Sequence, residues 1–168
     1  SFTARHFDRP FLGVYGACST MAESLAIGSA FVNGGYFNNV VCATGTHFST
    51  AERQYRFPLE LGNQRPPTSQ WTVTGAGSSV LSLNGTGHKI TKATLGKVTD
   101  YGIKDVNNMG AAMAPAAYDT LTQHFADLNI GPEAYDLIVT GDLGQLGWQI
   151  VGDLFAKDGI AMGGVYQD

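Results

Sequence analysis

Cys18 occupies a position at which a cysteine can act as a nucleophile. It lies between an apolar run at residues 11–17 and a segment at 19–35 whose pattern predicts a helix. The backbone N–H groups and the dipole at a helix N-terminus favour the thiolate, and the same corner can bind a small anion. A small cysteine in a buried position is the alternative, and spacing alone does not decide between the two.

His47 and Asp142 each follow a run of residues that predicts a buried strand. His47 comes after "NVVCAT" at 39–44, and Asp142 comes after "AYDLIVTG" at 134–141. Open α/β proteins bind ligands at the carboxyl ends of their strands, so both side chains are candidates for a binding site. Asp142 could instead cap the helix that follows it.

Arg53 and Arg56 are three residues apart in "TAERQYRFP", shortly after His47. Guanidinium groups suit carboxylate ligands, although a solvated loop is the more ordinary place for such a pair. Cys42 lies within an apolar run and is predicted to pack in the core. The histidines and cysteines show no metal-ligand spacing, so neither a bound metal nor another cofactor is expected.

The elements that would carry these residues alternate between strands and helices. Strands are predicted at 11–17, 39–44, 71–85, 88–100 and 134–147. Helices are predicted at 1–9, 19–35, 114–129 and 148–159. Pro115 falls in the first turn of the third helix, and the second helix is apolar on every side, which predicts that it is buried. The order begins with a βαβ unit and predicts an α/β fold with at least five strands.

The composition excludes some classes of partner. The 168 residues include 22 glycines but only 14% charged residues, and the net charge is −4. This charge argues against a nucleic-acid partner, and the scarcity of charged side chains favours a large subunit interface. Two cysteines do not make a disulfide framework.

The stretch "YGACSTMAES" resembles the cysteine elbow of the thiolase superfamily, which includes ketoacyl-synthase-III-like condensing enzymes, and five stretches resemble a family of sporulation proteins within that superfamily. They run in the same order from about Pro10 onward: "GACST", "TAERQYRFP", "TVTGAGSSVLS", "MGAAMAPAAYDT" and "YDLIVTGDLG". The resemblance implies an α/β fold, the middle portion of a thiolase-like αβαβα layered sandwich, in a homodimer. Residues 1–84 would end the N-terminal half, with the cysteine elbow, and residues 85–168 would begin the C-terminal half.

The resemblance also implies that the cysteine has lost its catalytic partners. Condensing enzymes take a histidine and an asparagine from a turn after the strand that matches "DLIVTGDLG". By that match, Gly141 stands in place of the histidine and Gly144 in place of the asparagine. Because glycine cannot take a proton, we expect that the chain is not an enzyme and that Cys18 is a vestigial nucleophile in a pocket that now binds.

For the sporulation family, the resemblance implies a non-catalytic protein that binds dipicolinic acid, alone or as its calcium chelate, for uptake into the developing spore. Its partners would be membrane proteins of the same sporulation operon. It would lie at the cytoplasmic face of the forespore or spore inner membrane, attached through those partners. The predicted ligand-binding residues are Cys18, Ser19, His47 and Arg53, with Asp142 as a further wall residue.

Two other functions stay open at this point. A thiolase-like or ketoacyl-synthase-III-like acyltransferase would use Cys18 as its nucleophile, with His47 or a residue outside this chain as the base. A structural subunit that bridges membrane proteins would form neither a ligand complex nor a covalent adduct.

Overall fold

The computed structural model describes residues 2–56, 62, 64, 66–70 and 72–168. The chain divides into two compact units, and each unit uses two separate stretches of sequence. Unit 1 comprises Ser1–Gly45 and Ala76–Ile90, and unit 2 comprises Thr46–Gly75 and Thr91–Asp168. The division into two thiolase-like halves at residue 84 stays a prediction.

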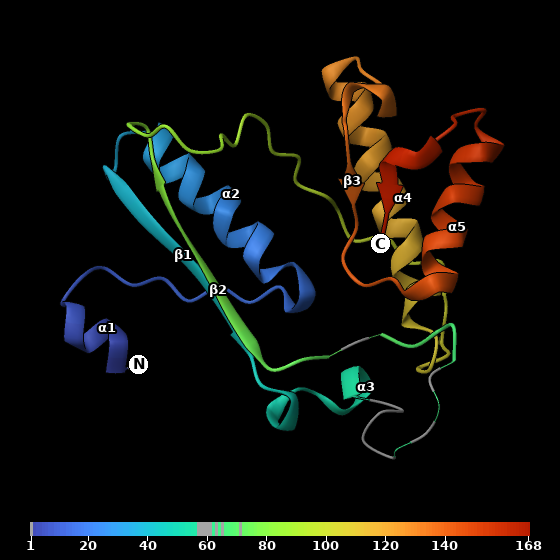
Figure 1. Cartoon of the computed structure of the whole chain (residues 1–168), viewed down its shortest axis with the longest axis horizontal. Coiled ribbons are helices and arrows are strands. Elements are labelled where there is room, and N and C mark those ends of the chain that lie inside the picture. The colour runs from blue at the N-terminus through green and yellow to red at the C-terminus, as the bar shows by residue number, and fades with distance from the viewer. Residues whose placement is uncertain (1, 57–61, 63, 65, 71) are drawn as a thin grey trace. The chain divides into compact units, whose positions relative to one another are not determined.

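Unit 1 is a helix packed on a two-stranded sheet (Figure 1). Its elements are α1 (Phe2–Phe7), the 3₁₀ turn η1 (Ala17–Ser19), α2 (Thr20–Asn33), β1 (Asn39–Thr46) and β2 (Gly75–Ser82). β1 pairs with β2, and the two strands run in opposite directions (Figure 1). The helix and the two strands that the apolar patterns predict in this part of the chain are confirmed.

A glycine lets α2 approach the sheet closely. A side chain at Gly28 would place its Cβ 2.7 Å from the Cys42 Sγ and 3.0 Å from a methyl group of Leu81. Cys42 is 3% exposed, and its thiol donates a hydrogen bond to the Ser24 carbonyl at 3.1 Å. The predicted role of Cys42 in the core is therefore confirmed.

α2 and β1 are only partly covered, which corrects the prediction that both are buried all round. In α2 the buried residues are Gly28 and Val32. In β1, Cys42 is buried, whereas Val41 is 67% exposed. Because successive side chains of a strand point to opposite faces, the sheet buries the face that carries Cys42 and exposes the other.

Two predicted strands are not formed by the described residues. Residues 11–16 contain no strand, and Phe11 is 70% exposed. Residues 88–100 likewise contain no strand. A strand needs a neighbour for its backbone N–H and C=O groups, and no described strand pairs with either segment. The predicted βαβ unit and the fifth strand are therefore wrong for this part of the chain.

Unit 2 is built around a pair of helices, α4 (Met109–Leu128) and α5 (Gly144–Lys157). Two short strands, β3 (Ile138–Val139) and β4 (Tyr166–Gln167), pair in parallel beside them. Its smaller helical elements are α3 (Arg53–Arg56), η2 (Phe48–Thr50), η4 (Pro132–Ala134) and η5 (Gly163–Val165). Its buried core consists of Ala114, Phe125, Ile138, Leu143, Val151, Phe155, Met162 and Tyr166.

α4 begins earlier than the sequence predicts. Asn108 caps it, because the Asn108 side chain accepts a hydrogen bond from the Ala111 N–H at 3.2 Å. Pro115 therefore lies inside the helix and is buried, which corrects its predicted place in the first turn. An apolar pattern does not mark a polar cap residue such as Asn108, which also follows another asparagine. The helix start predicted from that pattern, at residue 114, is therefore too late.

The fold is mixed α/β, as predicted, and is compatible with part of a thiolase-like sandwich. Among the described helices, none combines the length and the apolar character that crossing a bilayer requires.

Alkaline pH should destabilise both units. Burial raises the pKa of the Tyr166 phenol above its usual 10.0 and that of the Cys42 thiol above its usual 9.0. A hydrogen bond to Asp158 raises the pKa of Tyr118. Because the pKa of each group is higher in the folded than in the unfolded state, each group contributes fully to the free energy of unfolding at a pH below its pKa in the unfolded state. This contribution is lost as the pH rises through its pKa in the folded state.

Thermal unfolding followed from about pH 8 to about pH 11 measures this loss. We expect the midpoint to fall with rising pH, first as Cys42 titrates and then as the tyrosines do. Tyr166→Phe should flatten the upper part of the curve, since it removes one of the buried groups. A midpoint that stays constant over the whole range would contradict the expectation.

Candidate functional site

The cysteine elbow is the tight turn at residues 16–19, which leads directly into α2. Cys18 is exposed within η1, at the start of the helix. Ala17 has a φ of 49°, in the left-handed region that residues with a Cβ rarely adopt. Backbone strain of this kind persists only where the surrounding contacts impose it. The turn that holds Cys18 is therefore a defined structure and not a frayed helix end.

The hydrogen-bonding groups of Ser19 are used within this turn. Its backbone N–H and its hydroxyl both donate to the Gly16 carbonyl, at 2.9 Å and 2.7 Å. The Thr20 hydroxyl donates to the Ala17 carbonyl at 2.8 Å and accepts from the Gly16 N–H at 3.1 Å. A ligand that used the Ser19 donors would have to displace these bonds.

Glu23 places a carboxylate beside the elbow. A Cβ on Gly16 would lie 2.7 Å from the Glu23 Oε2, so the carboxylate rests against the turn. Its Oε2 is buried, and no described residue donates a hydrogen bond to it. A bare anion at this helix start would therefore face the carboxylate of Glu23.

His47 is exposed and caps η2. Its Nδ1 accepts a hydrogen bond from the Ser49 N–H at 3.3 Å and lies 2.8 Å from the Ser49 Oγ. With Nδ1 as the acceptor, the proton of the neutral ring is on Nε2, which can donate to a ligand. Arg53 begins α3, but its side chain lies outside the described residues.

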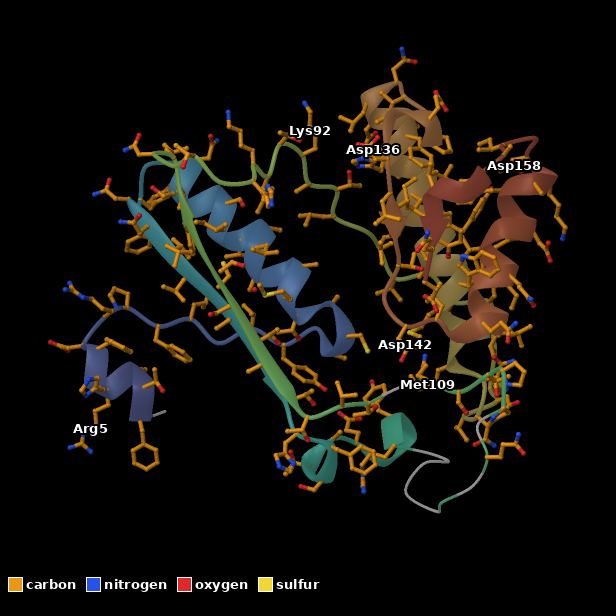
Figure 2. All side chains as sticks on the ribbon, viewed as in Figure 1. Arg5, Lys92, Met109, Asp136, Asp142 and Asp158 are labelled. Atoms are coloured by element: carbon orange, nitrogen blue, oxygen red, sulfur yellow. The ribbon has the colours of Figure 1, made fainter. Side chains whose placement is uncertain are left out.

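Asp142 lies in the turn between β3 and α5 (Figure 2). It is exposed and lines a cavity of about 550 Å³ within unit 2. The lining residues are Pro66, Pro67, Ser69, Asp142, Gly144, Gln145 and Asp168. A cavity of this size is in the range that small-molecule sites occupy.

Asp168 is the second acidic residue of this cavity, and sequence reasoning missed it. Its Oδ1 accepts hydrogen bonds from the Leu143 N–H at 2.8 Å and from the Thr140 hydroxyl at 3.1 Å. Asp168 follows β4, a strand of two residues whose parallel partner lies about 28 positions earlier. No local pattern signals such a pairing, so the residue could not be connected to Asp142 from the sequence.

The predicted ligand-binding residues belong to different units. Cys18 and Ser19 are in unit 1, whereas His47, Arg53 and Asp142 are in unit 2. Their assignment to one ligand stays a prediction. Among the described residues, no three His, Cys, Asp or Glu side chains gather in a group that could hold a metal ion.

Comparison with known proteins identifies the family. The family model for Stage V sporulation protein AD (SpoVAD) matches residues 1–168. The chain is 49% identical over 168 residues to Stage V sporulation protein AD of Bacillus subtilis (strain 168). The chain belongs to the SpoVAD family. The match covers 100% of this chain and 50% of that relative, so the chain spans about half of the relative's length.

Family membership connects this chain to sporulation, as the sequence resemblance predicted. Gly141 lies in the turn before α5, and Gly144 is the first residue of that helix. Gly144 has a φ of 69°, and a Cβ there would lie 3.1 Å from the Ser69 carbonyl oxygen, so the local backbone requires glycine. No described atom lies within 4 Å of a Cβ added at Gly141, so space alone does not require glycine there.

Proposed function

We propose that this SpoVAD-family chain is part of a non-catalytic protein that binds dipicolinic acid for its uptake into the developing spore. The observation that carries the proposal is the pair of glycines at 141 and 144, which the resemblance to condensing enzymes would set in place of a histidine and an asparagine. Neither glycine offers a side chain for proton transfer or for an oxyanion hole. Cys18 is exposed at a helix start and can contact a ligand without that machinery.

Carboxylates within each of the two units favour the calcium chelate of dipicolinate over the bare dianion. The Glu23 carboxylate rests against Gly16, and the cavity of unit 2 carries Asp142 and Asp168. A dianion would be repelled by these carboxylates, whereas its calcium chelate has no net charge. The Nε2–H group of His47 can donate to a ligand carboxylate, and the guanidinium of Arg53 is proposed for the same role.

We further propose a homodimer that is attached to the cytoplasmic face of the forespore or spore inner membrane through membrane proteins of the same operon. The segment before the elbow supports a subunit interface, because Phe11, Leu12 and Tyr15 are 70%, 61% and 73% exposed. Exposed apolar side chains that lie together are typical of interaction surfaces. Co-purification of the protein with and without those membrane proteins would test the attachment.

Calorimetric titration of dipicolinate into the full-length protein, with and without calcium, tests ligand binding. We expect saturable binding that calcium strengthens, and we expect Cys18→Ala to weaken it about tenfold, because one contact is lost. Cys42→Ala is the matched control, since that thiol is buried beneath α2, and it should leave the affinity unchanged. Unchanged affinity in Cys18→Ala would remove Cys18 from the site.

An acyltransferase is the second candidate, and the exposed thiol of Cys18 is the observation that favours it. Such an enzyme would form a thioester on Cys18 when it meets an acyl-CoA, with His47 or a residue outside this chain as the base. Mass spectrometry of the peptide that carries Cys18 would detect the adduct. The absence of any mass shift would count against this function, and the absence of both adduct and ligand would favour a structural subunit.

A further inference from the structure

We propose that Asp168 is a positioning residue, which holds the turn at 140–144 in the shape that presents Asp142 to the cavity of unit 2. This role in ligand binding rests on the proposed function, but the geometry behind it does not.

α5 begins without a cap of its own. The residue at its N-cap position is Leu143, which is 4% exposed and belongs to the core, and it makes no side-chain hydrogen bond to the helix. The first N–H groups of a helix have no partner within the helix, so a buried helix start needs acceptors from elsewhere. Here the core requires an apolar side chain at the position where a cap would stand.

Two distant segments supply the missing acceptors. The Asp168 Oδ1 accepts from the Leu143 N–H at 2.8 Å, and the Pro67 carbonyl accepts from the Leu146 N–H at 3.3 Å. Both acceptor residues line the same cavity as Asp142. One wall of the cavity is thus formed by the groups that cap α5.

The parallel strands bring Asp168 to this place. Ile138 pairs with Tyr166 and Val139 with Gln167, and the Thr140 N–H donates to the Gln167 carbonyl at 3.2 Å. The residues that follow the two strands, Thr140 and Asp168, therefore lie beside each other. The Thr140 hydroxyl donates to the Asp168 Oδ1 at 3.1 Å. Asp168 joins Thr140 and Leu143, which stand on either side of Gly141 and Asp142.

Two substitutions separate the acceptor of Asp168 from its charge. Asp168→Asn keeps a side-chain oxygen that can accept both hydrogen bonds, whereas Asp168→Ala removes it. Hydrogen exchange at the Leu143 amide, measured in the full-length protein, reports the cap directly. We expect Asp168→Ala to accelerate this exchange about tenfold or more, and Asp168→Asn to restore it to within about threefold of the wild type.

Dipicolinate titration of the same variants gives the second readout. With calcium present, Asp168→Ala should lower the affinity about fivefold, and Asp168→Asn should lower it by less, since it keeps the acceptor and loses only the charge. If the wild type binds no dipicolinate, the proposed function fails while the exchange measurement still tests the cap. If the wild type binds and Asp168→Ala binds equally well, the positioning role is wrong although the proposed function stands.

Two further outcomes would overturn the proposal. An unchanged Leu143 exchange rate in Asp168→Ala would show that the turn keeps its shape without the cap. Exchange in Asp168→Asn as fast as in Asp168→Ala would show that the charge matters and the acceptor does not.

Should Asp168→Ala fail to fold, Thr140→Val provides a second test, because it removes one donor to the same oxygen. It should accelerate the Leu143 exchange about threefold, and no acceleration would contradict the role.

Discussion

A methyl group added at position 110 should destabilise unit 2 by about 3 kcal/mol, because it has no room between α4 and α5. The Cβ of Gly110→Ala would overlap the Leu143 carbonyl oxygen and lie 3.2 Å from the Gly147 Cα. Backbone atoms cannot turn away as a flexible side chain can, so the two helices would have to separate. Denaturant unfolding of the variant measures the loss.

Gly152→Ala is the matched control for this substitution. Gly152 lies inside α5, and no described atom lies within 4 Å of a Cβ added to it. The same change should therefore stabilise the helix by up to about 1 kcal/mol, since alanine loses less backbone entropy than glycine. Equal effects at Gly110 and Gly152 would disprove the close approach of the helices.

Removal of the Phe155 ring should have an effect of similar size. Phe155 is 0% exposed and packs edge-on against Tyr118, with ring centroids 4.9 Å apart, and against Phe125 at 6.0 Å. Phe155→Ala loses the transfer free energy of the ring and leaves a cavity, so we expect a loss of about 4 kcal/mol. Phe155→Leu should lose much less, because it fills most of the space.

Phe2→Ala provides the comparison for this prediction. Phe2 is 92% exposed in α1, so the same change removes a ring that packs against little. We expect its effect on the free energy of unfolding to be within about 0.5 kcal/mol of zero. Should Phe155→Ala prove as mild as Phe2→Ala, the core of unit 2 would not be centred on Phe155.

The helices were largely predictable from the sequence, because each carries its own signal. α2 ends before Gly34, which serves as its C-cap, and α5 ends at Lys157, close to its predicted end at residue 159. The predicted start of α5 at residue 148 is wrong, because the helix begins at Gly144, inside the segment predicted as a strand at 134–147, where three glycines weaken the helix signal. The strands were less predictable, because a strand depends on a partner elsewhere in the chain. Residues 88–100 have a pattern typical of a strand but no strand partner among the described residues. β4 has a partner but is only two residues long.

The candidate site was predictable where chemistry depends on local sequence. Cys18 at the start of α2 and Asp142 after β3 are where their neighbours predicted them. Glu23 and Asp168 were missed for opposite reasons. Glu23 lies in the first turn of α2, where an acidic residue is common, and only the structure shows that its carboxylate rests against Gly16. Asp168 reaches Leu143 only through the pairing of β3 with β4.

Each unit is built from two separate stretches of sequence, and this affects recombination between related genes. Unit 1 is interrupted after residue 45, resumes at residue 76 and ends at residue 90, with unit 2 in the gaps. A single crossover between the genes of two relatives, if it falls at any of these junctions, leaves at least one unit with residues from both parents. Packing pairs such as Gly28 with Leu81, which lie on opposite sides of such a junction, would then come from different ancestors. Crossovers between residues 45 and 91 should therefore be disfavoured, since each of them mixes the residues of at least one packed unit.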